Sequence, residues 1–428
     1  MLQIPETNQK RIVIIGGGFA GISLAETLAK SNYQVVIIDK NNYHQFQPLF
    51  YQVATARIEP SAILFPLRKL FHRHANLFLR ITQVTSIDPQ RKLVETQSGS
   101  CRYDYLVIAA GAQTSYFGLK NIEAGAFPMK SVTEALTLRN SILNHLENAL
   151  LERDETVKQQ LLNIVIVGGG PTGTEVAGAL AEMKKHIFPK EYKELDVSRI
   201  RIVLIEAAPA LLGGMSKKSS GKSKKYLEKL GVEVLINTQV KDYVNHEVSL
   251  GNGLTIPTRT LIWAAGIKGT TFDGIPQSVY LPNGRVKVDA YNRMTDVEDI
   301  YVVGDNCAML TNETPKGHPQ VAQVAIQQAR NLGKNFINMQ LGKTLKPFKY
   351  KNLGSLATVG RHLAVADLPG ITFYGLFAWY VWMFVHLMAI LGVRNRVFVF
   401  LNWMWSYITF DQSLRLIIQR DNGVKLNN

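Results

Sequence analysis

Residues 11–21 read RIVIIGGGFAG, and residues 163–173 repeat the pattern as NIVIVGGGPTG. Each stretch is an apolar, β-branched run followed by a glycine turn, and helical patterns follow at residues 22–30 and 175–185. A strand, a glycine turn and a helix in this order begin a βαβ unit. The two turns lie a domain length apart, so the sequence predicts an α/β protein with two Rossmann-like dinucleotide-binding domains.

The first turn has the spacing Gly16-x-Gly18-x-x-Gly21. Gly16 allows the tight turn, Gly18 lets the backbone approach a pyrophosphate, and Gly21 lets the helix pack on the strand. The next apolar strand ends at Asp39, where a carboxylate can accept hydrogen bonds from ribose hydroxyls. The residues expected at this first nucleotide are Gly16, Gly17, Gly18, Phe19, Ala20, Gly21, Asp39 and Lys40.

The second turn repeats the spacing, and its acidic counterpart is Glu206. Glu206 follows a strand at residues 200–205 and comes late in the sequence because residues 186–199 are inserted after the helix. No arginine adjoins Glu206, so the sequence favours a ribose 2′-hydroxyl over a 2′-phosphate, and hence NADH over NADPH. The residues expected at this second nucleotide are Gly168, Gly170, Pro171, Thr172, Gly173 and Glu206.

Three further apolar strands end in small or acidic residues. They read LVIAAG at residues 106–111, LIWAAG at 261–266 and IYVVGD at 300–305. In this order, with the paired glycine turns, they resemble the two-dinucleotide-binding-domain flavoprotein family over residues 11–338. The resemblance implies one FAD and one NADH stacked for hydride transfer, with Asp305 on the ribityl chain. It adds Ala110 and Gly111 to the FAD contacts, and Ala265 and Gly266 to the NADH contacts.

A helix is predicted after residue 318, where the sequence reads HPQVAQVAIQQA. Gln323 and Gln327 share one face of it because they lie four residues apart, and both can hydrogen-bond a carbonyl. By composition alone the segment is equally typical of a solvated helix. The pattern Ala322-Gln-x-Ala-x-Gln327 resembles the quinone-site motif of type II NADH:quinone oxidoreductases. That resemblance implies quinone contacts at Gln323 and Gln327, and FAD contacts at Ala322 and Gln323.

Two other segments resemble the same family, and they suggest a catalytic residue. Residues 46–55, FQPLFYQVAT, resemble its flavin-side segment, and residues 168–175, GGGPTGTE, resemble its NADH turn. The resemblance implies that Glu175 is the carboxylate that handles protons. A first-turn acid that complements the helix dipole is an equally weighted interpretation of Glu175. The resemblance also implies that the backbone of Val84 contacts the FAD adenine.

Bulk composition narrows the class of protein. The chain has 428 residues, 46% of them hydrophobic and 19% charged, which excludes a disordered chain and a small disulfide scaffold. Its net charge of +15 indicates an anionic partner, and charge alone does not choose among phospholipid, nucleic acid and a phosphate-bearing cofactor. Given the motifs, we expect no nucleic-acid partner and no metal. The lysine-rich run at residues 216–225 is most simply a solvated loop and helix start.

The two cysteines, Cys101 and Cys307, form no C-x-x-C motif. A dithiol relay beside the flavin, as in disulfide reductases, is therefore not expected, and electrons must leave by a diffusible acceptor.

The C-terminal part is predicted to attach to a membrane. Residues 371–393 contain no Asp, Glu, Lys or Arg, but Trp379 and Trp382 sit at the middle rather than the ends, and the run also holds His386. A stripe at helical spacing follows, at Trp403, Tyr407, Phe410, Leu414, Ile417 and Ile418. We expect a helix lying in the interface, with a membrane span and a soluble dimer interface as alternatives. In type II enzymes such helices anchor the protein and contribute to a homodimer.

The sequence therefore predicts a peripheral, monotopic enzyme on the cytoplasmic side of the cell inner membrane. No apolar leader precedes the first strand. The expected parts are an FAD-binding domain at residues 1–125 and 276–345, an NADH-binding domain at 126–275, and a C-terminal helical module at 346–428. NADH would reduce FAD, and FAD would reduce a membrane quinone without proton pumping. A soluble NAD(P)H-dependent reductase and a non-catalytic adaptor are the alternatives.

Overall fold

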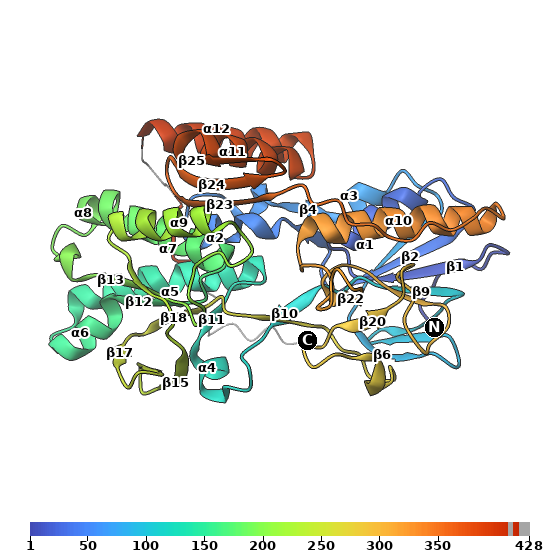
Figure 1. Cartoon of the computed structure of the whole chain (residues 1–428), viewed down its shortest axis with the longest axis horizontal. Coiled ribbons are helices and arrows are strands. Elements are labelled where there is room, and N and C mark those ends of the chain that lie inside the picture. Colours follow the sequence, from blue (N-terminus) through green and yellow to red (C-terminus); the bar gives the residue numbers. More distant parts are fainter. Residues whose placement is uncertain (410–413, 419–428) are drawn as a thin grey trace. The chain divides into compact units, whose positions relative to one another are not determined.

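The computed structural model describes residues 1–409 and 414–418, and the chain forms two compact units (Figure 1). Unit 1 consists of Met1–Gln45, Leu64–Gln113 and Ile267–Leu353. Unit 2 consists of Phe46–Ile63, Thr114–Gly266 and the described part of the chain from residue 354 onward. Unit 2 therefore contains most of the predicted NADH-binding domain, the predicted C-terminal module and the short segment Phe46–Ile63.

Unit 1 is built on a five-stranded parallel sheet. Its order is β21 (Ile300–Val302), β9 (Tyr105–Ile108), β1 (Arg11–Ile15), β2 (Gln34–Asp39) and β5 (Leu77–Ile81). The β-branched residues of β1 and β2 are almost fully buried, as expected for a parallel sheet covered on both faces. The helices α1 (Phe19–Leu28) and α10 (Ala322–Gln340) pack against each other. The first predicted Rossmann-like fold is confirmed.

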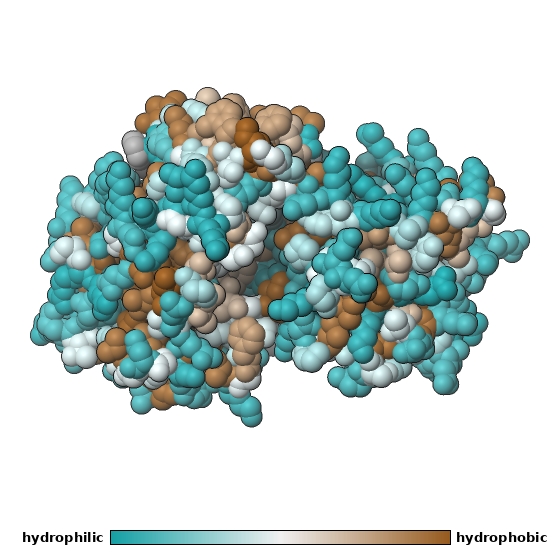
Figure 2. Space-filling model, viewed as in Figure 1, coloured by the Kyte–Doolittle hydropathy of each residue, from teal (hydrophilic) through white to brown (hydrophobic). Residues whose placement is uncertain are grey.

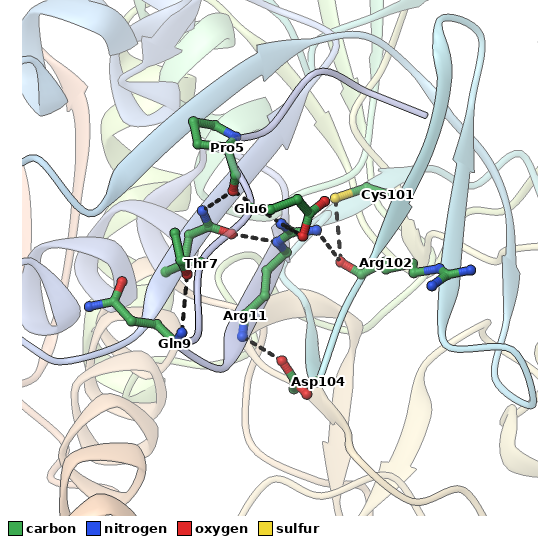
Figure 3. Close-up of polar contacts among 9 residues, drawn as sticks. Pro5, Glu6, Thr7, Gln9, Arg11, Cys101, Arg102 and Asp104 are labelled. Carbon is green, nitrogen blue, oxygen red and sulfur yellow. Dashed lines mark hydrogen bonds and ion pairs between the residues drawn. The ribbon is translucent and has the colours of Figure 1, made fainter.

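Smaller elements complete unit 1. They are β3 (Tyr43–Gln45), β4 (Leu64–Pro66), α3 (Leu67–Phe71), β6 (Val84–Asp88), β7 (Leu93–Thr96), β8 (Gly99–Arg102), β20 (Val286–Val288), η5 (Gly304–Asn306) and β22 (Cys307–Met309). The N-terminal segment is tied to the sheet through Arg11 (Figure 3). The Arg11 amide donates to the Asp104 carboxylate at 2.6 Å, and its guanidinium donates to the carbonyls of Pro5 and Arg102.

Unit 2 repeats the arrangement with a second parallel sheet. Its order is β11 (Phe127–Pro128), β18 (Thr260–Trp263), β12 (Asn163–Val167), β13 (Arg201–Ile205) and β14 (Glu233–Leu235). Around it lie α2 (Phe50–Ala54), α5 (Val132–Leu151), α6 (Glu155–Leu162), α7 (Pro171–His186), α8 (Phe188–Glu191) and α9 (Lys217–Lys229). The inserted residues form α8 and η3 (Val197–Arg199). The lysine-rich run begins α9, as predicted.

The C-terminal module is a small antiparallel sheet that carries two helices (Figure 1). Its strands are β23 (Ser355–Gly360), β24 (Leu363–Leu368) and β25 (Ile371–Tyr374), and its helices are α11 (Gly375–Ala389) and α12 (Val393–Thr409). The uncharged run is thus a strand followed by a helix. None of the helices within the described residues is long and apolar enough to cross a membrane.

The predicted striped helix is partly wrong. Trp403 and Tyr407 lie in α12, which the structure describes as far as Thr409, but the chain from Leu414 to Ile418 is not helical. Phe410 lies outside the described residues. Contacts distant in sequence hold the later segment: Arg415 pairs with Glu191 of α8, and Asn140 of α5 donates to the Ile418 carbonyl at 2.5 Å. Apolar spacing alone cannot reveal such contacts.

The module is seated on α7 through a glycine. A Cβ atom at Gly178 would overlap the carbonyl group of Val359 in β23. Because Gly178 has no side chain, β23 runs against the backbone of α7. This contact places the residues of β23 beside the first half of α7.

Candidate functional site

The glycine turn of unit 1 has the geometry of a phosphate cradle. Gly16 has φ +106°, and a Cβ there would overlap the Ala109 carbonyl at the end of β9. A Cβ at Gly21 would in turn overlap the Gly16 carbonyl, whereas a Cβ at Gly18 would meet nothing within 4 Å. Gly18 is also the N-cap of α1, and no side chain of the described residues caps that helix. The first N–H groups of α1 therefore face open space where a pyrophosphate fits.

Asp39 lies directly beside this turn. Its carboxylate accepts the Gly17 amide at 2.5 Å and the Asn41 amide at 2.7 Å. Burial raises the pKa of Asp39, and the two amide hydrogen bonds counteract that effect. The carboxylate is thereby fixed at the carboxyl end of β2, next to Lys40, in position to accept ribose hydroxyls.

Other predicted flavin contacts lie within unit 1. Gly304, which precedes Asp305 with φ +73°, packs so that a Cβ would contact Ala20 of α1 at 3.5 Å and Ala325 of α10 at 3.3 Å. The Gly304 amide donates to Gln328 at 2.8 Å. Gly111, after β9, has φ +71° and an open Cβ position. The strand ends that carry Gly16, Asp39, Ala110 and Asp305 thus meet at one edge of the sheet. Val84 begins β6, where it pairs with Thr96.

The glycine turn of unit 2 has the same backbone geometry as the turn of unit 1. Gly168 has φ +109° and abuts the Ala264 carbonyl, Gly173 abuts the Gly168 carbonyl, and the Cβ position of Gly170 is open. Pro171 and Thr172 form the first turn of α7, and Ala265 and Gly266 follow β18.

Glu206 plays the same part in unit 2 as Asp39 in unit 1. It accepts the Gly169 amide at 2.5 Å and the Ala208 amide at 2.7 Å. The insertion at residues 186–199 lengthens the chain between the glycine turn and Glu206. Glu206 nevertheless lies beside the turn, as predicted.

Glu175 is buried, with 8% of its surface exposed. It lies beyond the first turn of α7, and its carboxylate accepts the Thr358 amide of β23 at 3.4 Å. Burial raises the pKa of Glu175 to about 8, while the hydrogen bond from the Thr358 amide lowers it in part. A first-turn acid that complements the helix dipole would be exposed and ionised, so that interpretation does not describe Glu175. Near neutral pH this carboxyl group holds a proton.

A polar chain leads from α12 toward Glu175. The Trp403 indole donates to Gln52 at 2.7 Å, and Gln52 donates to the Tyr51 hydroxyl at 2.9 Å. Tyr51 is buried near Glu175. Burial raises the pKa of Tyr51, and Glu175 raises it further once its own carboxyl group is ionised. Tyr51 and Gln52 lie in the segment 46–55, which resembles the flavin-side segment of the family, but the sequence alone indicates no role for either residue.

Tyr51, Gln52 and Trp403 line a cavity of unit 2. Residues of α2, α7 and β23 also line it, and α11 and α12 supply aromatic walls. The aromatic residues that line it are Tyr51, Trp379, Trp382, Trp403 and Tyr407. Arg57 and Glu182 form an ion pair at its charged end. No sequence pattern indicates this ion pair, because Arg57 and Glu182 lie far apart in the chain.

His386 does not add charge to the apolar helix α11. Its ring stacks on Trp382 at 4.2 Å, and its Nδ1 lies 2.8 Å from the Trp382 carbonyl. Burial lowers the pKa of His386 to about 4, so the ring is neutral at pH 7.

The two predicted quinone glutamines have backbone partners in unit 1. Gln327 accepts the Lys351 amide and donates to the Lys351 carbonyl, both at 2.9 Å, and Gln323 accepts the Leu353 amide at 3.0 Å. The predicted helix containing them is confirmed as α10, which starts at Ala322 itself. The glutamines hold the segment that leads out of unit 1.

Both thiols are buried in the core of unit 1. Cys307 accepts weak hydrogen bonds from Asn292 and Gln328, each at 3.4 Å, and burial raises its pKa to about 11. A thiol held in its neutral form is a poor nucleophile, which agrees with the predicted lack of a dithiol relay.

Comparison with known proteins decides the family. A model described as pyridine nucleotide-disulphide oxidoreductase matches residues 10–329, and one described as the NDH2 C-terminal domain matches residues 352–409. The chain is 34% identical to the type II NADH:quinone oxidoreductase NdhA of Mycobacterium tuberculosis over 93% of this chain and 87% of that protein. The chain belongs to the type II NADH:quinone oxidoreductase family. The resemblance inferred from the sequence is confirmed.

A further relative and a solved structure are similar to this chain over most of its length. An internal alternative NAD(P)H-ubiquinone oxidoreductase of Arabidopsis thaliana is 28% identical over 94% of this chain and 85% of that protein. The structure of NDH2 from Plasmodium falciparum in complex with NADH matches with a TM-score of 0.88 at 23% identity, covering 96% of this chain and all of that one. At this identity the likeness concerns the fold.

Glu206→Arg is expected to reverse the nucleotide preference of this type II chain. The change removes a carboxylate that can accept the ribose 2′-hydroxyl and supplies a cation for a 2′-phosphate. We expect kcat/KM for NADH to fall on the order of tenfold to a hundredfold, and that for NADPH to rise. Glu247→Arg, an exposed change on β16 (Glu247–Leu250), is the matched control. An unchanged preference would place Glu206 away from the ribose.

Glu175→Gln is expected to change how stability depends on pH. The pKa of Glu175 is raised from 4.5 to about 8, so the wild-type protein loses stability as the pH rises between these values. The variant lacks this titration, and its stability relative to wild type should rise by up to about 1.4 kcal/mol per pH unit in that window. Denaturant unfolding at several pH values measures the difference. A pH-independent difference would contradict the assignment, and Glu247→Gln is the control.

Proposed function

We propose that this chain oxidises NADH and reduces a quinone at a membrane surface, without moving protons across the bilayer. FAD, when bound, would supply the two-electron redox chemistry that links NADH to the quinone. The glycine turn and Asp39 of unit 1 would hold FAD, and the turn and Glu206 of unit 2 would hold NADH. The predicted site residues fit these roles because both turns leave open the space a pyrophosphate needs.

The observation that carries the proposal is the aromatic-walled cavity that α11 and α12 form with α2, α7 and β23. The aromatic walls suit a flat quinone ring, and a quinone would reach the cavity along α11 and α12, the helices proposed to meet the membrane. Thr358 lines this cavity, and its amide donates to Glu175, whose carboxyl group holds a proton near neutral pH. Quinol formation requires protons, and Glu175 with Tyr51 would supply one by hydrogen-bonded transfer.

The family resemblance implies that Gln323 and Gln327 serve the quinone, and we retain this as a proposal. Because Gln327 already binds the Lys351 backbone with both ends of its amide, its part in quinone binding would be to position this segment.

The activity is tested by reducing the bound flavin with NADH and then reoxidising it with a quinone, both in the absence of oxygen. NADH added without oxygen should bleach the flavin absorbance, and a short-chain quinone added afterwards should restore it. Bleaching without restoration would favour the alternative, a soluble reductase of another acceptor. Absence of bleaching with bound flavin would favour a non-catalytic adaptor.

The membrane surface would be met by α11 and α12, where Figure 2 shows apolar side chains gathered. Phe377, Phe384, Trp405 and Ile408 are each more than half exposed on these helices. Burying such side chains in the headgroup boundary favours a monotopic attachment. We further propose a homodimer and a position on the cytoplasmic side of the inner membrane.

Phe384→Ser combined with Ile408→Ser is expected to weaken membrane attachment. Phe384 is 66% exposed and Ile408 69% exposed, so both changes leave the core intact. Each removed apolar side chain should weaken binding on the order of tenfold, measured by vesicle flotation. Leu254→Ser, which changes a 61% exposed residue elsewhere in unit 2, is the control. Unaltered flotation of the double variant would exclude this face.

A further inference from the structure

Helix α9 carries a concentration of charge that the proposed function does not use. Its 13 residues include six lysines and one glutamate. The side chains of Ser219, Ser220, Ser223 and Leu227 form its buried face.

The lysines of α9 fall on two different faces. One stripe consists of Lys218, Lys222, Lys225 and Lys229, which follow helical spacing and so share one face. Lys217 and Lys224 lie on another face, where Lys224 pairs with Glu228 at 3.3 Å.

The lysine stripe begins at the start of α11. The ammonium groups of Lys218 and Lys222 lie 5.6 and 4.9 Å from the ring centre of Tyr374. Tyr374 is the N-cap of α11, and the exposed Leu376 and Phe377 follow it immediately. Positive charge therefore borders the apolar face of α11.

The stripe ends at a groove beside the last turn of α12. Lys229 lines this groove together with Lys185, Arg361 and His362. The Arg361 guanidinium lies 4.4 Å from the ring centre of Tyr407 in α12. The basic surface thus follows the C-terminal module from the start of one apolar helix to the end of the other.

The acids around the stripe already have partners. The Asp367 carboxylate of β24 accepts the Ser216 amide at 2.7 Å and the Ser219 hydroxyl at 2.6 Å, which fixes α9 on the sheet that carries α11. Glu182, the acid among the groove residues, binds Arg57. The lysine stripe is therefore fixed beside the apolar face of α11. Asp367 and Glu182 are engaged with other groups and do not neutralise its charge.

We propose that the lysine stripe and the groove at its end bind the phosphate groups of anionic phospholipids. This inference rests on the membrane attachment proposed above. A basic side chain near an anionic bilayer strengthens binding roughly fivefold, and the effect fades within a Debye length. Apolar side chains of α11 and α12 would enter the headgroup region of the bilayer, and the adjoining lysines would favour anionic lipids over neutral ones.

Two double variants of the full-length enzyme test the proposal. Lys218→Gln with Lys225→Gln removes two charges from the stripe, and Lys217→Gln with Lys224→Gln removes the same charge from the other face of α9. Flotation compares vesicles of phosphatidylcholine alone with vesicles containing about 30% phosphatidylglycerol, at about 0.1 M and 0.5 M salt.

We expect the wild-type enzyme to prefer the anionic vesicles at low salt. The stripe variant should lose on the order of tenfold in binding to them, the control variant about twofold or less, and high salt should remove the difference. NADH turnover with a short-chain quinone should stay unchanged in both variants.

Equal losses in the two variants would overturn the stripe as the recognition surface. Equal binding of the wild type to both vesicle types would overturn lipid selection and leave attachment through α11 and α12 intact. Failure of the wild type to bind either vesicle would overturn that attachment too, while the anaerobic test of NADH and quinone activity would still stand separately.

Discussion

The contact between β23 and α7 at Gly178 is the constraint on which unit 2 depends. There the Val359 carbonyl occupies the space that any side chain would fill. The same contact brings the Thr358 amide to Glu175 and the Arg361 amide to Glu182. The C-terminal sheet, and with it both apolar helices, is therefore positioned by backbone contact with the helix that begins at the glycine turn.

Burial accounts for the chemistry of the candidate site. Glu175, Tyr51 and His386 are all held in their neutral forms, because the interior disfavours charge. Glu182 is the contrasting case, since an ion pair with Arg57 compensates its charge. A neutral region beside a charged pair suits a substrate whose ring is apolar and whose oxygens must gain protons.

The sequence predicted those features that depend on local patterns. The two glycine turns, their strands and helices, and the acids at Asp39 and Glu206 could all be located, because spacing along the chain determines them. The polar chain of Trp403, Gln52 and Tyr51 could not, because it joins residues some 350 positions apart. The non-helical course of residues 414–418 was also missed, since the ion pair of Arg415 with Glu191 has no periodic signature. The backbone partners of Gln323 and Gln327 likewise appear only in three dimensions.

The two glycine turns are so alike that they cannot by themselves distinguish FAD from NADH. Gly16 and Gly168 abut equivalent carbonyls, and Asp39 and Glu206 accept equivalent amides. The turn is thus a generic part that reads a pyrophosphate and a ribose, which FAD and NADH have in common. The identity of each cofactor must then be set by more distant residues, so that one architectural part can be duplicated while its surroundings diverge.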